Sequence, residues 1–436
     1  MVIIELGERR DEVPLDTEPR LPRWLSLRWP RLILVLILLL AVVTAGDPLP
    51  RYLPELVIPA RLGAQLTIEG DRLFLSEPTE DGGQISAIRA SDGRRLWQSP
   101  PMVGQPTIYG LLSGRLILTA SREPGETGET AAVDPKTGAL SWRHPATLAG
   151  IGTGDVLLLR DGEVRNQQPS MLMAVDPASG SVVWSHRVPA GATLSTSFSY
   201  SSGTERISQI MVGLPSGRVE LREMTTGALI RAIDLPPRLP EDQQRMPYIV
   251  GDLLIAPGDN DQITAYGLDR LEHRWTIQRD RNRVFGPIDC GDSLCFFHPS
   301  GGIWAVDAST GKDRWADAKW GMVSSLDGYL LATEADLTRR PPMLAVLASD
   351  TGRVLGELGR WNIAGPVADG RPVAAIRSDS DGRAWIAWLD LAKQKARIVL
   401  VVRDVSGDCY VHPDGGTGVL ICRRSDGAIM VWRLPA

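Results

Sequence analysis

Four cysteines are the residues whose type and spacing most directly predict a chemistry, because opposed thiols in an oxidising compartment form disulfides. Cys290 and Cys295 are symmetric about an Asp-Ser pair, and Cys409 and Cys422 are symmetric about a Gly-Gly pair. Both pairs are typical of turns, and residues placed symmetrically about the turn of an antiparallel hairpin face each other. The spacing therefore predicts the disulfides Cys290–Cys295 and Cys409–Cys422, of which the first closes the shorter loop and should stabilise less.

The sequence leaves two other interpretations of these cysteines open. Four free buried thiols are common in cytosolic proteins. A structural zinc site is the weaker alternative, because the paired C-x-x-C segments that such sites use are absent.

No set of residues with a catalytic pattern is found. The five histidines are His144, His186, His273, His298 and His412. Two of them, His144 and His186, each follow a repeated tryptophan by two positions, which indicates a structural or surface role. The motifs G-x-S-x-G, H-E-x-x-H and G-x-x-x-x-G-K-[ST] are absent, and the acidic segments 379–382 and 259–261 lack the rest of a calcium loop. We therefore predict no catalytic residue, no cofactor and no metal ligand, although carboxylates distant in sequence could still meet in the folded chain.

The elements that would position these residues belong to a repeat, A-V-D-x-x-[ST]-G-x-x-x-W. Three copies are nearly complete and two are partial, and their positions are Asp134, Gly138 and Trp142; Asp176, Gly180 and Trp184; Asp307, Gly311 and Trp315; Asp92 and Trp97; and Trp275. We expect a strand before the aspartate, then a tight turn in which its carboxylate accepts backbone hydrogen bonds and the glycine has positive φ. The tryptophan should begin the next strand and pack in the core rather than bind a ligand.

The period of this repeat predicts the fold. The tryptophan positions and their weaker equivalents are 97, 142, 184, 231, 275, 315, 356 and 398, at intervals of 40 to 47 residues. That interval is the length of one four-stranded propeller blade. A further pair of strands at 418–433 lacks its final strand, which residues 55–59 could supply to close a ring. The prediction is an all-β propeller of eight or nine four-stranded blades over residues 51–436.

The repeat resembles that of the PQQ-like β-propeller family over about residues 60–434. That family includes quinoprotein alcohol dehydrogenases and the propeller lipoprotein of outer-membrane assembly. The resemblance implies the fold. In the dehydrogenases, PQQ is expected between a tryptophan and a ring made by two adjacent disulfide-bonded cysteines, beside a calcium site. This sequence has no adjacent cysteines, and no cysteine for lipid attachment near its N-terminal apolar run.

The N-terminal segment predicts a membrane anchor. Residues 1–30 are polar and are predicted to be a disordered cytoplasmic tail, and residues 31–50 a single transmembrane helix. The uncharged run at 32–45 reaches the roughly 20 residues of a span only with flanking residues at the interfaces. Four arginines and two tryptophans lie between residues 20 and 31, so that side should face the cytoplasm. A cleaved signal peptide and a buried core helix are the alternatives.

These features lead to a functional expectation. The net charge of -5 disfavours nucleic-acid binding. We expect a single-pass cell-membrane protein whose monomeric, extracytoplasmic propeller is a scaffold for an unidentified protein or other ligand, without catalysis. A PQQ-dependent oxidoreductase-like enzyme and a sensor ectodomain are the alternatives. Loops carry recognition in many folds, and we expect partner contacts at the variable inserts between the expected strands, which are 77–83, 121–130, 161–170, 236–246 and 333–342.

Overall fold

The structure is a computed structural model of the 436-residue chain. It describes residues 54–80, 82–102, 104–121, 128–162, 169–201, 204–236, 247–258, 262–278, 285–298, 301–336, 338, 340–367, 369–414 and 417–434. Contacts divide the chain into Met1–Leu49 and Pro50–Ala436. The predicted tail and transmembrane helix, 1–30 and 31–50, lie outside the described residues. Within the described ranges, no helix is long and apolar enough to cross a membrane.

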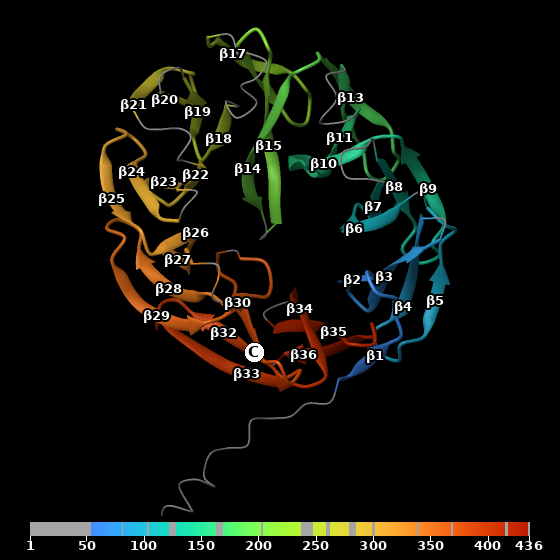
Figure 1. Ribbon diagram of the computed structural model, residues 1–436. Coiled ribbons are helices and arrows are strands. Elements are labelled where there is room, and N and C mark those ends of the chain that lie inside the picture. The colour runs from blue at the N-terminus through green and yellow to red at the C-terminus, as the bar shows by residue number, and fades with distance from the viewer. Residues whose placement is uncertain are drawn as a thin grey trace, which may run out of the picture. The chain divides into compact units, whose positions relative to one another are not determined.

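The described residues form nine four-stranded antiparallel sheets, arranged around a common axis as the blades of a propeller (Figure 1). In blades 1 to 8 the strands follow one another along the chain from the axis outward. The all-β prediction is confirmed, and of the two predicted blade numbers the structure has nine. The strands of the first four blades are β2 (Gln65–Glu69), β3 (Arg72–Thr79), β4 (Gly82–Arg89) and β5 (Arg95–Gln98); β6 (Gln105–Leu112), β7 (Arg115–Ser121), β8 (Glu129–Val133) and β9 (Leu140–His144); β10 (Thr147–Ile151), β11 (Leu157–Asp161), β12 (Ser170–Val175) and β13 (Val182–Val188); and β14 (Thr193–Ser201), β15 (Thr204–Gly213), β16 (Arg218–Glu223) and β17 (Leu229–Asp234).

Blades 5 to 8 continue the same order. Their strands are β18 (Tyr248–Val250), β19 (Leu253–Pro257), β20 (Gln262–Gly267) and β21 (His273–Gln278); β22 (Phe285–Asp289), β23 (Ser293–Phe297), β24 (Ile303–Asp307) and β25 (Asp313–Asp317); β26 (Trp320–Leu326), β27 (Tyr329–Glu334), β28 (Met343–Ala348) and β29 (Val354–Arg360); and β30 (Asn362–Ile363), β31 (Val373–Ser378), β32 (Ala384–Asp390) and β33 (Lys395–Val402). Apart from one short 3₁₀ helix in blade 3, at Thr153–Asp155, the described residues contain no helix.

Blade 9 joins the two ends of the described chain. Its inner strands β34 (Val405–Asp414), β35 (Thr417–Arg424) and β36 (Ile429–Leu434) come from the C-terminal end, and its outer strand β1 (Leu56–Ile58) comes from the N-terminal end. β1 pairs antiparallel with β36, with Leu56 opposite Val431 and Ile58 opposite Ile429. The prediction that residues 55–59 supply the missing strand is confirmed. Because blade 9 then packs on blade 1, neither end of the ring leaves an apolar sheet face uncovered.

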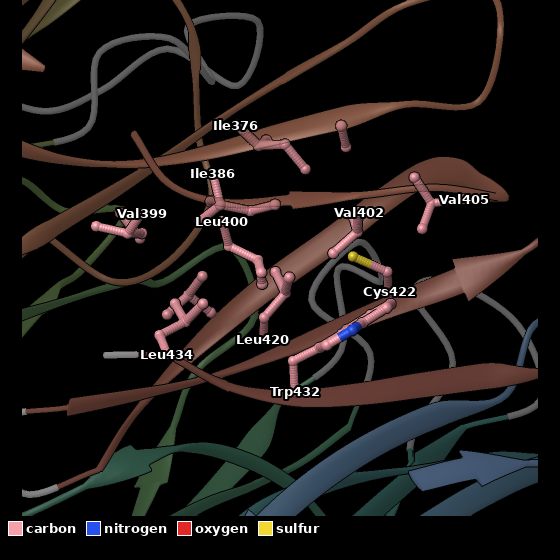
Figure 2. Close-up of a cluster of buried hydrophobic side chains, with 14 of the residues drawn as sticks. Ile376, Ile386, Val399, Leu400, Val402, Val405, Leu420, Cys422, Trp432 and Leu434 are labelled. Carbon is pink, nitrogen blue, oxygen red and sulfur yellow. The ribbon is translucent and has the colours of Figure 1, made fainter. Parts of the chain in front are cut away.

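The hydrophobic core lies between neighbouring blades. Figure 2 shows the layer between blades 8 and 9, where Ile386 and Leu400 of one sheet lie near Leu420 and Trp432 of the other. Because each sheet has a neighbour on both faces, its middle strands are buried on both sides and carry consecutive apolar residues. In β23, for example, four successive residues are buried. This double burial explains the short uninterrupted apolar runs of the sequence.

Both predicted disulfides are present. Cys409 lies directly opposite Cys422 in the β34–β35 hairpin, and their Cα atoms are 4.1 Å apart. In the β22–β23 hairpin Cys295 instead opposes Ile288, so Cys290 reaches it diagonally over a Cα separation of 5.9 Å. The predicted centre of that turn, at Asp-Ser, is therefore wrong by one position. Gly291 has φ +78°, a conformation that glycine adopts without strain, and it places the turn one residue earlier.

Candidate functional site

In each nearly complete repeat, the aspartate carboxylate accepts hydrogen bonds within the turn that joins the third and fourth strands of the blade. In blade 2 the Asp134 carboxylate accepts hydrogen bonds from the backbone N–H groups of Lys136 (2.7 Å) and Thr137 (3.0 Å). Gly138, with φ +74°, donates its N–H to the Asp134 carbonyl. The bond from Lys136 is the largest cause that lowers the pKa of Asp134. Hydrogen bonds within the turn also lower the pKa of Asp92, Asp176 and Asp307.

The repeat tryptophan docks on the turn of the next blade. Nε1 of Trp142 donates a 2.9 Å hydrogen bond to the Pro177 carbonyl of blade 3, and the indole covers Gly180. A Cβ atom at Gly180 would lie 2.4 Å from Cγ of Trp142, so only glycine permits this approach. The same contacts join Trp97 to Pro135 and Gly138, Trp184 to Met224 and Gly227, Trp275 to Ala308 and Gly311, and Trp315 to Ser349 and Gly352. These tryptophans hold adjacent blades together.

The histidines also make contacts within this scaffold. Nε2 of His144 lies 2.7 Å from the carbonyl oxygen of Gly180, so it contacts the same turn that Trp142 covers. Nε2 of His273 lies 2.9 Å from the Thr276 hydroxyl. Burial lowers the pKa of His186, to which the charge of Arg222 adds.

The acidic turn at 379–382 satisfies its own carboxylate. Asp379 accepts hydrogen bonds from the backbone N–H groups of Asp381 (2.9 Å) and Arg383 (3.0 Å), and it pairs with the Arg383 guanidinium at 3.0 Å. The similar segment 259–261 lies outside the described residues. In the ranges that the structure describes, no group of three or more His, Cys, Asp or Glu side chains is arranged to hold a metal ion.

The quinone site implied by the resemblance does not fit the residues present. That site needs a ring closed by two adjacent cysteines. Here Cys290 and Cys295 are fully buried in the apolar cluster between blades 6 and 7, and Cys422 lies in the cluster between blades 8 and 9. Neither disulfide joins adjacent residues. That no cofactor binds stays a prediction.

The two ends of the propeller differ in kind. Because the four strands of a blade are antiparallel, the connection between its first and second strands lies at the same end as the repeat turn between its third and fourth strands. We name this end the turn face. The connections between second and third strands, and those from blade to blade, lie at the opposite end, which we name the loop face. The inserts 121–130, 161–170, 236–246 and 333–342 join strand ends at the loop face, although they belong to blades 2, 3 and 7 and to the link between blades 4 and 5. The predicted insert 77–83 is instead a tight hairpin at the same face, in which Thr79 of β3 opposes Gly82 of β4. Sequence spacing gave no sign of this grouping.

A second group of side chains lies on the innermost strands of three adjacent blades, nearest the axis in Figure 1. Tyr410 of β34 and Tyr109 and Leu111 of β6 are 48%, 45% and 42% exposed. Between them, on β2, Glu69 accepts a hydrogen bond from the Leu111 N–H. Burial raises the pKa of Glu69, and the charge of His412 and that hydrogen bond oppose the rise. Sequence reasoning missed this group, because its members lie in three different blades.

Comparison with known families gives one match. Residues 44–212 match the model of a family described as the outer membrane protein assembly factor BamB. The match covers blades 1 to 3 and the first two strands of blade 4 up to residue 212, and with it two of the three nearly complete repeats. No curated protein sequence matches the chain.

Solved structures similar to this chain share little sequence with it. BamB from Moraxella catarrhalis is 15% identical, with a TM-score of 0.38, and the match covers 87% of this chain and 97% of that one. A europium-containing methanol dehydrogenase is 11% identical, with a TM-score of 0.42 and coverage of 87% and 85%. The computationally designed protein Ika8 is 10% identical, with a TM-score of 0.44 and coverage of 87% and 99%. Similarity at this level identifies neither a partner nor a reaction.

Proposed function

We propose that this chain, a β-propeller of PQQ-like repeats, is a membrane-anchored scaffold outside the cytoplasm that binds a protein partner through its loop face. One observation carries the proposal. Four of the five longest connections between described strands join strand ends at the loop face, in blades 2, 3 and 7 and between blades 4 and 5, and the remaining one, 364–372, joins β30 to β31 at the turn face. Such clustered loops on a rigid frame are a common basis of recognition.

The opposite end supports this assignment. At the turn face, the repeat carboxylates accept hydrogen bonds from their own turns, and the repeat glycines are covered by tryptophans of neighbouring blades. Those residues of the turn face therefore serve the fold. The matching family is described as an assembly factor, a role that works through protein contacts, and this supports a protein as the partner.

Two features support a location outside the cytoplasm. The two disulfides occupy all four cysteines, and such bonds persist in oxidising compartments. The apolar run at 32–45, with arginines ahead of it, would export the residues that follow.

Site-specific photocrosslinking on the full chain in its native membranes tests the loop face. The crosslinking residue replaces Glu80 or Thr338, both exposed at the loop face, or Asp71 or Lys395, both exposed at the turn face. A discrete crosslinked protein from positions 80 and 338, and none from 71 and 395, is the expected result. Crosslinks confined to the turn-face positions, or none at any position, would contradict the proposal.

The group at the axis favours a second candidate function, a small-ligand site. A partly buried carboxyl group on a strand between two strands with exposed aromatic rings is a usual combination in such sites. An absorbance spectrum and a metal analysis of the purified full chain test the oxidoreductase form of this candidate. A bound quinone would favour it over the scaffold.

A further inference from the structure

The first described strand enters the propeller at the turn face. β36 begins at Ile429, after a loop-face connection, and runs toward the turn face, so the antiparallel β1 starts at the turn face with Leu56. The side chain of Leu56 contacts the position of Gly93, the turn glycine of blade 1, with Cδ1 at 2.6 Å from a Cβ built there. Leu56 thus takes the place of a repeat tryptophan, and this contact independently fixes the turn face as the point of entry.

The length of chain before this point limits the distance to the membrane. If residues 31–50 form the anchor of the proposed function, only five residues, 51–55, lie between Pro50 and Leu56, which makes six Cα-to-Cα steps. A fully extended chain spans at most about 3.3–3.6 Å per residue, or roughly 20 Å for this linker. The start of β1, at the turn face of blade 9, would then lie within about 20 Å of the bilayer surface.

The same face carries exposed apolar side chains on three consecutive blades. The outer strands of blades 2, 3 and 4 begin with residues that we name the rim patch: Leu140, Val182, Val183, Leu229 and Ile230, which are 57%, 46%, 52%, 47% and 39% exposed. At the start of the outer strand, blades 1, 5, 6 and 8 have Arg95, His273, Asp313 and Lys395. Blade 7 has Val354 alone, 38% exposed.

The carboxylates of the three turns that precede the rim patch are hydrogen bonded or paired. Asp134 pairs with Arg115 at 3.7 Å, Asp176 accepts hydrogen bonds from Ser179, and the Glu223 carboxylate accepts them from Thr225 and Thr226. Bringing these turns close to a headgroup layer therefore leaves no new carboxylate without a partner. Exposed apolar patches of this kind mark interaction sites.

We propose that the rim patch inserts into the surface of the bilayer, so that the propeller sits with its turn face toward the membrane and presents its loop face to the partner. This inference rests on the proposed function, since it takes residues 31–50 as the anchor. The short linker at blade 9 and the apolar residues of blades 2 to 4 give two attachments on one face, about a third of the ring apart. An interfacial contact of this type is stabilised by the burial of apolar side chains more than by attraction between charges.

Fluorescence quenching by lipids tests the orientation. All four cysteines form disulfides, so a single added cysteine takes an environment-sensitive dye specifically. The full chain, carrying Val183→Cys in the rim patch, is reconstituted in phosphatidylcholine–phosphatidylglycerol vesicles with nitroxide-labelled lipid. Lys395→Cys is the matched control at the same strand position of blade 8, and Ser380→Cys is the loop-face control.

The expected result is quenching at position 183 at least threefold stronger than at 380, with an intermediate value at 395. Equal, weak quenching at 183 and 380 would overturn the inference. A second variant, Leu229→Cys with Val182→Asp and Val183→Asp, should lose the quenching at 229 while its thermal midpoint stays within about 2 °C of the Leu229→Cys protein. Should the aspartates unfold it, Val182→Thr with Val183→Thr replaces them and should weaken the quenching.

Failure of this inference can be told apart from failure of the proposed function. Vesicle-bound protein with an unquenched position 183 and loop-face crosslinks intact means that the orientation is wrong and the scaffold stands. Protein that does not stay with the vesicles means that the anchor itself is wrong. A protein crosslinked to position 183 in native membranes would overturn the lipid contact in favour of a protein one.

Discussion

Gly356 of blade 7 packs against Gln394 of blade 8, since a Cβ atom built on Gly356 would lie 2.5 Å from the Gln394 Cβ. In the contacts made by the repeat tryptophans the large residue is on the first blade and the glycine is on the next one, so here the order is reversed. Gly356 opposes Val346 of β28, the place a repeat tryptophan takes in other blades, and Gln394, with φ +51°, takes the place of the turn glycine in blade 8. The large residue and the small one have exchanged positions. The contact between blades 7 and 8 therefore survives although the motif does not.

This exchange predicts a rescue. Gly356→Trp should cost about 1–3 kcal/mol of unfolding free energy, because the indole meets the Gln394 side chain. Adding Gln394→Gly should recover most of that loss, since it restores the pairing of the other blades and relieves a positive φ. Urea unfolding of the two single variants and the double variant measures the coupling. Additive losses would show that these residues do not interact.

The docking of tryptophan on glycine should account for much of the cohesion between blades. Trp142→Ala should lower the unfolding free energy by about 3 kcal/mol, since it removes a large ring and its hydrogen bond to Pro177. Trp142→Phe, the control, keeps most of the packing and should cost nearer 1 kcal/mol. Gly180→Ala should destabilise as well, because a Cβ there would meet the indole. Equal stabilities of the alanine and phenylalanine variants would contradict this account.

The two disulfides should differ in their contribution. Closing a loop removes entropy from the unfolded chain in proportion to the logarithm of loop length. The sequence separations are 5 and 13 residues. Cys290→Ala with Cys295→Ala should therefore cost about 2 kcal/mol, and Cys409→Ala with Cys422→Ala about 3 kcal/mol. Denaturant unfolding of both pairs under non-reducing conditions measures the difference, and the opposite order would point to lost packing of the fully buried first pair.

Glu69 should make stability depend on pH. Burial raises the pKa of this carboxyl group above its unfolded value, so its contribution is most favourable below the ordinary glutamate pKa and is lost as pH rises through the folded pKa. Glu69→Gln removes that loss. The variant should melt above the wild type at pH 8, and the difference should vanish near pH 4. Thermal melts across this range, with exposed Glu80→Gln as control, measure it; a difference independent of pH would exclude the carboxyl group as its source.

The repeat allowed most of the fold to be predicted, because its period and turn residues are local. Asp134 and Gly138 identify a turn wherever they recur, and the spacing of Trp142 from Trp184 gives the length of a blade. The disulfide Cys409–Cys422 was predicted for the same reason, since a hairpin is a local structure. The exact turn of the Cys290–Cys295 hairpin was not, because adjacent Gly, Asp and Ser residues allow two centres and only the packed hairpin selects one.

What the sequence by itself determined is therefore the blade, with its strands, its turn and its closing strand at the N-terminal end of the propeller. The tertiary structure alone decided which residues meet between blades: Trp142 with Gly180, Gln394 with Gly356, Glu69 with Leu111 and His412. It also decided that four distant inserts share the loop face and that the chain enters at the turn face. These relations depend on the direction of each strand around a closed ring, and a pattern confined to one blade carries no information about its neighbours.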